Sequence, residues 1–315
     1  MRLAVLILVL AGMTGCDRAR DLGPPRAVAV RADGALELAL TTLNLRYETA
    51  EDRGSRGWVR RIPQVVRAVR KLGPDVLGVQ EGLHGQVADL WASLPDYEMV
   101  GWGRDDGLRR GEYSAIFYRR DRFEADAVDV GMFWLSAKPE VAGSMTWGNG
   151  IPRVCTWVRL VDRASGRGFY VFNTHWDHRH QGSRERAARL IAERIDGRRC
   201  GDEPVVLMGD FNAVESNPAV AFLAGERVSL AGEEGEWDGG LLDVYQVLNA
   251  GERNRRTLHL WSGQRDGYFK IDHILVSRGA RVISSGILEN QEPMISDHHA
   301  VSARVVFPGG VGVSE

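Results

Sequence analysis

The chain has 315 residues, of which 44% are hydrophobic and 26% charged, and its formal net charge is −2. This composition is typical of a globular protein with a sizeable core and excludes a fibrous or disordered chain. The near-neutral charge gives no overall positive field, so the composition does not require a long polyanion as partner.

The first residues have the layout of an export signal. Arg2 precedes an apolar run over residues 3–11 that is too short to span a bilayer, and small residues then lead to Cys16. Because Gly-Cys after an apolar run resembles a bacterial lipobox, we expect residues 1–15 to be a lipoprotein signal peptide, with lipid on Cys16. We expect residues 16–34 to be a tether. The expected location is therefore the periplasm or the cell surface, with the protein anchored to a membrane.

Residues 35–308 show no repeat, low-complexity block or linker, so we expect one domain there and a short tail over residues 309–315. Short apolar strands alternate with helical stretches, but several strands are consecutive, which predicts an α/β fold with mixed sheets. The apolar surroundings of Cys155 are typical of a buried thiol, and whether it pairs with Cys200 stays open.

The expected elements follow from hydrophobic spacing and turn residues. Valines at helical spacing predict a helix that starts at Pro63, and Ser183 is expected to cap another helix. A long irregular stretch over residues 136–153 is typical of a binding loop. In chain order, we expect strand 36–43, helix 63–72, strand 75–79, helix 85–93, strands 113–118, 154–161 and 169–173, a helix from residue 183, and strands 205–208, 270–276 and 300–307.

Polar side chains follow the expected strands at six separated points of the chain. Asp210 and Asn212 come directly after a buried strand, where Gly209 lets the backbone turn. A carboxylate and an amide two residues apart on a rigid strand end can deprotonate and orient a water. Any one of these residues alone could be a helix cap or a solvated loop residue. Six of them together predict that the side chains converge on one edge of the sheets, the rim, where they can bind a ligand. The six are Asn44, Glu81, His175, Asp210 with Asn212, Asp272, and Asp297 with His298.

Three of these residues form an oxygen-rich set that suits a hard cation. The side chains of Asn44, Glu81 and Asp297 offer the carboxylate and amide oxygens that Mg²⁺ or Mn²⁺ prefers. Such an ion would polarise a phosphoryl oxygen. His298 needs a partner that fixes its tautomer, and Asp272 on another strand is the candidate.

The same residues, in the same order, resemble the endonuclease/exonuclease/phosphatase superfamily, which shares its fold with DNase I. The resemblance covers about residues 36–307, and the segments 111–118 and 173–178 resemble a bacterial, often exported branch related to the Angle and CCR4-type proteins. It implies a four-layer αββα sandwich, in which two mixed β-sheets pack face to face with helices outside.

The resemblance also implies a role for each site residue. Glu81 would be the main metal ligand, and Asn44 and Asp297 would complete or hydrogen-bond the hydrated metal. Asp210 would activate water, and Asn212 would orient that water or hold a phosphate oxygen. The resemblance leaves open whether Asp210 or the histidine pair is the general base. The others would contact phosphate: His298 backed by Asp272, His175 as a phosphate ligand or acid, and Tyr113.

Further residues are candidates for the substrate side of the site. We expect Arg153 and Arg179 to lie near the phosphate. The loop residues Asp177, His178 and His180 either brace His175 or simply form a polar loop.

The predicted function is an exported Mg²⁺- or Mn²⁺-dependent phosphoesterase that hydrolyses a phosphodiester by in-line attack of water. The alternatives are a phosphomonoesterase acting on a small phosphate ester or lipid head group and, in another class, a non-catalytic exported binding lipoprotein. A dinuclear zinc hydrolase is disfavoured because Asn173 stands where its motif needs a histidine. The expected partner is a phosphate ester (nucleic acid, lipid head group or small molecule). We infer no protein partner and expect a monomer.

Overall fold

The structure is a computed structural model that describes residues 34–288 and 294–309. The expected signal peptide, Cys16 and all but the last residue of the expected tether lie outside these ranges. Within the described residues, no helix combines the length and apolar character needed to cross a membrane.

The first sheet has six strands in the order β13-β14-β1-β2-β4-β3. Only β1 and β2 pair in parallel, and the other neighbours are antiparallel. The strands are β1 (Leu36–Asn44), β2 (Val76–Gly82), β3 (Tyr97–Val100), β4 (Tyr113–Arg119), β13 (Arg281–Leu288) and β14 (Ala300–Phe307).

The second sheet repeats this plan in the order β11-β12-β8-β7-β6-β5, with β7 and β8 as its parallel pair. Its strands are β5 (Phe123–Trp134), β6 (Val154–Asp162), β7 (Gly168–His175), β8 (Val205–Asp210), β11 (Leu241–Asp243) and β12 (Asp272–Ser277). A separate hairpin consists of β9 (Val228–Leu230) and β10 (Glu233–Gly235).

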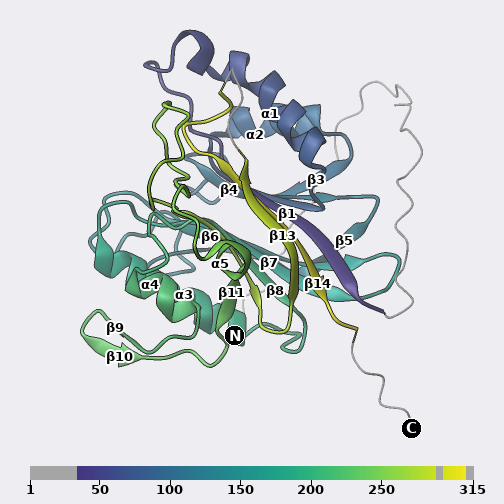
Figure 1. Ribbon diagram of the computed structural model, residues 1–315. Helices are drawn as coiled ribbons and strands as arrows, with labels where there is room; N and C mark the ends of the chain where they lie inside the picture. The colour runs from purple at the N-terminus through teal and green to yellow at the C-terminus, as the bar shows by residue number, and fades with distance from the viewer. Residues whose placement is uncertain (1–33, 289–293, 310–315) are drawn as a thin grey trace, which may run out of the picture.

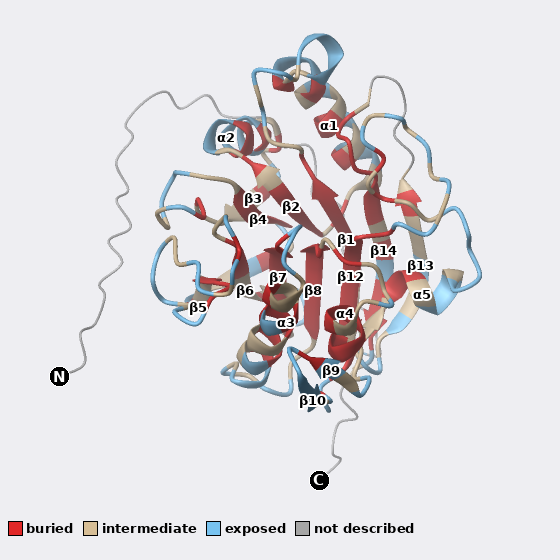
Figure 2. Cartoon of the chain, turned by 90° about the vertical axis from the view of Figure 1, so that its left-hand side faces the viewer, coloured by how far each residue is buried: buried red, intermediate tan, exposed pale blue. Residues whose placement is uncertain are grey.

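Helices cover the outer faces of both sheets, which confirms the predicted four-layer sandwich (Figure 1). Three apolar cores separate the layers: one between the sheets, one under α1 and α2, and one under α3 and α4. Figure 2 shows that the facing strands at the centre are buried along most of their length. The helices are α1 (Trp58–Leu72), α2 (His84–Ser93), α3 (Gln181–Asp196), α4 (Pro218–Leu223) and α5 (Val244–Asn249), with a 3-10 turn at Gly54–Arg56.

The topology explains why polar residues from distant segments meet. The two parallel pairs, β1-β2 and β7-β8, end at the same rim and carry Asn44, Glu81, His175 and Asp210 at or next to their ends. Their antiparallel neighbours β12 and β14 begin at that rim, so Asp272 opens β12 opposite Asp210. His298 lies just before β14. Six sequence segments therefore deliver side chains to one edge of the sandwich.

Several expected boundaries were wrong. Helix α1 begins at Trp58, five residues before the predicted start, so Pro63 lies inside the helix. Pro63 cannot donate to the carbonyl of Val59, and this part of the helix lies at the surface, where Val59 is 77% exposed. Helix α3 begins at Gln181 and is capped by His180, whose side chain accepts from the backbone N–H of Ser183.

Strands β3, β5, β11 and β13 were not predicted, nor were helices α4 and α5 and the β9-β10 hairpin. Most of these elements are short or lie at sheet edges, and the alternating polar residues of β5 hide its apolar face. Cys155 and Cys200 are both free thiols, which settles the question that the sequence left open.

Candidate active site

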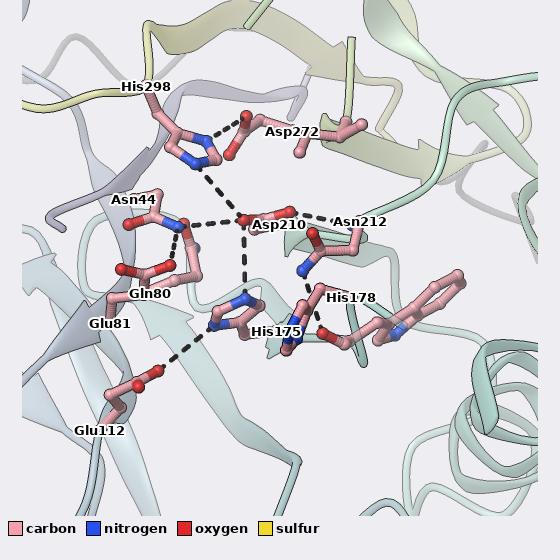
Figure 3. Close-up of polar contacts among 12 residues, drawn as sticks. Asn44, Gln80, Glu81, Glu112, His175, His178, Asp210, Asn212, Asp272 and His298 are labelled. Carbon is pink, nitrogen blue, oxygen red and sulfur yellow. Dashed lines mark hydrogen bonds and ion pairs between the residues drawn. The ribbon is translucent and has the colours of Figure 1, made fainter. Parts of the chain in front are cut away.

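Asp210 lies at the centre of the polar cluster at the rim (Figure 3). Its carboxylate oxygen Oδ2 is 3.0 Å from Asn44 Nδ2, 3.6 Å from His175 Nε2 and 3.9 Å from His298 Nε2. The other oxygen, Oδ1, accepts a hydrogen bond of 2.9 Å from the backbone N–H of Asn212. Asp210 is 1% exposed, so these contacts form in a largely water-free environment.

Asn44 joins two acidic residues of the cluster. Its amide nitrogen donates to Glu81 Oε1 at 2.9 Å as well as to Asp210, while its amide oxygen accepts from the backbone N–H of Arg46 at 2.8 Å. The other oxygen of Glu81 accepts from the backbone N–H of Tyr47 at 3.2 Å. Asn44 therefore fixes the positions of the Glu81 and Asp210 carboxylates.

The backbone is strained at the residues that line the site. The φ angles of Glu81, Asn212 and Leu260 are 63°, 48° and 49°. Residues other than glycine rarely adopt such positive values. Gly209 has a φ of 146°, and a Cβ atom there would lie 1.9 Å from the carbonyl oxygen of Thr174. Only glycine lets β8 approach β7 this closely, which brings Asp210 beside His175.

Two imidazoles flank Asp210 and differ in charge. His298 Nδ1 is 2.9 Å from Asp272 Oδ2. Burial alone would lower the pKa of His298, but Asp272 and Asp210 raise it well above its usual value. Burial, Arg153 and Arg104 hold the pKa of His175 well below its usual value. The site thus presents an imidazolium on one side of Asp210 and a neutral imidazole on the other.

A second histidine–carboxylate pair lies on the far side of His175. Glu112 Oε2 is 3.7 Å from His175 Nδ1, and the same carboxylate forms two hydrogen bonds of 2.6 Å with Arg104. Burial raises the pKa of Glu112 to about 7, and Arg104 opposes this shift. Bidentate pairing favours the ionised form of Glu112. Glu112 and Arg104 were not among the predicted site residues. A signal was available for Glu112, because it directly precedes a strand, and the predicted residue His298 lies two residues before one.

The cluster opens into a cavity of about 760 Å³. The loops around Ile151 and His178 form one wall, and His298, Leu258 and Leu260 also line the cavity. Leu260 is 70% exposed, so an exposed apolar residue is part of the lining of this polar cavity. A cavity of this size accommodates a small molecule.

A buried network supports the turn that carries Asn212. Phe211 stacks between the rings of Trp176 and His273, with centroid distances of 4.4 Å and 5.0 Å. His273 Nε2 is 2.9 Å from the carbonyl oxygen of Ala213, and Lys270 Nζ is 2.8 Å from His273 Nδ1. Lys270 is fully buried and completes the network through Asp243, 2.9 Å away.

The structure brings the six predicted strand-end points together, and it places the other candidates as follows. Arg153, Arg179 and Asp297 line the cavity. Tyr113 is not among the cavity-lining residues: its hydroxyl lies 2.9 Å from His84 Nδ1 and donates to the carbonyl of Leu108 at 3.0 Å.

The loop after His175 has partners other than His175. Asp177 Oδ1 accepts from the backbone N–H groups of Arg179 and His180, and His178 contacts Arg153. Of the two interpretations, the structure therefore supports a polar loop.

The donor set of the cluster fits a divalent cation. Glu81, His175 and Asp210 each offer a ligand atom, and these atoms lie within 4.8 Å of one another. Burial and Asp272 raise the pKa of Asp210 to about 7, and burial also raises the pKa of Asp297. A cation would relieve the repulsion among these carboxylates. The predicted ligand Asn44 presents its amide nitrogen to the two carboxylates, and Asp297 lies 3.9 Å from Arg46 Nε.

Comparisons with known proteins give one consistent result. A family model described as the Endonuclease/Exonuclease/phosphatase family matches residues 41–298. The structure of an endonuclease/exonuclease/phosphatase from Bacteroides vulgatus is 31% identical with a TM-score of 0.77, and the match covers 86% of this chain and 98% of that one. A mannosyl-6-phosphatase from Bacteroides thetaiotaomicron is 32% identical with a TM-score of 0.73, over 86% of this chain and 100% of that one.

More distant proteins share the fold. The catalytic domain of human Nocturnin has a TM-score of 0.64 at 17% identity, over 85% of this chain and 93% of that one. The two curated sequences that match are aligned over 59% and 26% of their own lengths. These more distant likenesses therefore establish architecture only.

Proposed function

The chain belongs to the endonuclease/exonuclease/phosphatase family, and on that premise we propose that it is a divalent-metal-dependent phosphoesterase. The observation that carries the proposal is the arrangement of Asp210 between a cationic and a neutral histidine, with Glu81 held beside it by Asn44. This arrangement offers a base, a metal ligand and a phosphate contact within one cavity.

Each group has a step in the proposed hydrolysis. Asp210 accepts the proton of the attacking water, and Asn212, fixed through its Nδ2 to the carbonyl of Trp176 at 3.1 Å, orients that water. His298, kept protonated by Asp272, stabilises negative charge on the phosphoryl oxygens. A divalent cation held by Glu81 would supply further neutralisation of that charge.

We propose a phosphodiester as the substrate, as the sequence suggests, with in-line attack of water. A phosphomonoester is the second candidate, favoured by the similarity to a mannosyl-6-phosphatase along nearly the whole described chain. The cavity volume of about 760 Å³ is also of the size that accommodates a small ester.

Hydrolysis assays test this proposal. We expect Mg²⁺- or Mn²⁺-dependent release of p-nitrophenol from bis-p-nitrophenyl phosphate, from p-nitrophenyl phosphate, or from both. Asp210→Ala should lower kcat about 10²- to 10⁴-fold, the usual effect of losing a general base. Asp202→Ala removes an exposed carboxylate and should leave kcat unchanged. Retained turnover in Asp210→Ala would contradict the assignment of Asp210 as the base. If the wild type hydrolyses neither ester, a binding protein is favoured over an enzyme.

We also propose that the protein is exported and anchored through Cys16, on the strength of the apolar run and the Gly-Cys pair. In a bacterial host, Cys16→Ser should move the protein from the membrane fraction to the soluble fraction. Cys200→Ser serves as the matched control and should stay with the membrane. Wild-type protein recovered only in the soluble fraction would count against lipidation.

A further inference from the structure

Arg153 is a buried cation whose charge is poorly matched by the protein. Its side chain lines the cavity and the residue is only 4% exposed. Neither Nε nor Nη1 has a hydrogen-bond partner. The one carboxylate that the described residues bring within 4.0 Å is Asp177, which lies 4.0 Å from Nε. A buried guanidinium in this state is costly unless a ligand completes its hydrogen bonds.

The remaining nitrogen of Arg153 determines the state of His178. Nη2 lies 3.0 Å from His178 Nδ1. Because arginine only donates, Nδ1 must be the acceptor and the neutral ring carries its proton on Nε2. His178 is exposed and lines the same cavity wall. Arg153 and His178 therefore both present donors, and this corner of the cavity suits an anion.

The corner lies beyond the reacting centre. Asp210 on β8 pairs with His175 on β7, and Cys155 on β6 pairs with Thr174, so Arg153 stands just before the strand on the far side of β7. Adjacent strands are about 4.8 Å apart, so the backbone at the start of β6 is about 10 Å from the backbone of Asp210. The Arg153 guanidinium reaches back far enough to interact electrostatically with His175 and Asp210, and on its other side it contacts His178. The side toward His178 is therefore the part of the cavity that another group of the same molecule would occupy.

The charges on this wall also favour an anion. Glu112 is paired with Arg104, and Asp177 already accepts two backbone N–H groups. Arg179 is exposed and adds a further positive charge at the cavity. Among these four residues and Arg153, the three arginines thus outnumber the two carboxylates.

From these contacts we infer that Arg153 and His178 form a second anion subsite, which binds a non-reacting phosphate or carboxylate group of the substrate. The inference rests on the proposed phosphoesterase function in its second form, hydrolysis of a phosphomonoester, and narrows it to monoesters with a second negative group beyond the scissile phosphate. It separates the role of Arg153 from that of His298, which faces the reacting phosphate.

Matched substrates test the subsite. Phosphate release from glucose 6-phosphate is compared with release from glucose 1,6-bisphosphate, which adds a phosphate, and from 6-phosphogluconate, which adds a carboxylate. In Arg153→Met, kcat/KM for at least one doubly anionic substrate should fall about 10- to 100-fold more than for glucose 6-phosphate. Which of the two loses more identifies the group bound. Equal losses on all three substrates would overturn the inference and place Arg153 at the scissile phosphate.

Equilibrium binding gives a readout that does not depend on catalysis. With chelator present, inorganic phosphate should bind the wild type in calorimetry, and Arg153→Met should weaken that binding at least about tenfold. Arg186→Met removes an exposed arginine of α3 outside the cavity and should bind like wild type. Arg153→Lys keeps the positive charge but has fewer donors, so its affinity should lie between those of wild type and Arg153→Met. An intermediate affinity would show that the loss in Arg153→Met comes from the missing charge and not from a folding defect.

Two outcomes of the calorimetry would overturn the subsite: no phosphate binding by the wild type, or equal binding by wild type and Arg153→Met. Failure of the proposed function would look different, because the wild type would then hydrolyse none of the esters whatever the calorimetry showed.

Discussion

Glu81→Gln is expected to lower metal-dependent turnover at least about 10³-fold, because the carboxylate that we propose as the main ligand of the cation becomes a neutral amide. This corresponds to about 4 kcal/mol of transition-state stabilisation, within the range expected from a catalytic metal ion. The fold should persist. Glu81 contributes to the raised pKa values of Asp210 and Asp297, so removing its charge relieves repulsion among buried carboxylates.

Thermal unfolding with and without metal separates the two effects. Wild-type protein should gain stability when Mg²⁺ or Mn²⁺ is added, since the ion binds only the folded state. Glu81→Gln should unfold at or above the wild-type temperature without metal and gain little from it. Glu48→Gln, a change at an exposed neighbouring position, is the matched control and should respond like wild type. Full activity of Glu81→Gln with metal would refute the assignment of Glu81.

The residues at the ends of the parallel strands were predictable because their signal is local. Each of Asn44, Glu81 and Asp210 ends a largely apolar strand segment in the sequence, with at most one other residue between it and the last apolar side chain or glycine. Parallel strands in one sheet end at the same edge, which brings Asn44 to Glu81 and His175 to Asp210. The packing of the two sheets face to face then brings these two pairs together. An antiparallel neighbour begins at the edge where these strands end, so residues at or just before its start lie at the same edge. Asp272 and His298 are examples.

Glu112 was missed although the same logic applies to it. It directly precedes β4, which is antiparallel to β2 and pairs Tyr113 with Gly82, next to Glu81. Nothing in the sequence indicates that Arg104 closes back on Glu112, so its charge gave no reason to place it in the site. The Arg104–Glu112 and Arg153–His178 contacts join segments whose approach only the tertiary structure defines.

Arg61 was missed for a different reason, since it lies on the apolar stripe of α1 between Trp58 and Val65. The predicted helix began at Pro63, so the stripe could not be extended back to Arg61. The guanidinium is fully buried and donates to the carbonyls of Leu45, Arg46, Arg56 and Ile295. It thereby joins the segment after Asn44 to the segment before Asp297.

Aromatic rings complete the environment of Arg61. Trp58 and Trp261 lie on the guanidinium at 5.3 Å and 5.6 Å. Burial lowers the pKa of Arg61 to about 10, so the side chain remains charged at neutral pH. No other residue type offers five donors in one plane, which is why a buried arginine can satisfy four carbonyls from three segments.

Arg61→Met should therefore lower the free energy of unfolding by about 3–5 kcal/mol, since several buried carbonyls lose a charged donor at once. Arg67→Met, an exposed change in the same helix, should alter it by less than about 0.5 kcal/mol. Urea unfolding of both variants measures the difference, and metal titration of folded Arg61→Met should show weaker binding because the Asn44 and Asp297 segments lose their common support. If both variants unfold at the same urea concentration, water satisfies these carbonyls as well as Arg61 does, and the guanidinium does not hold the rim together.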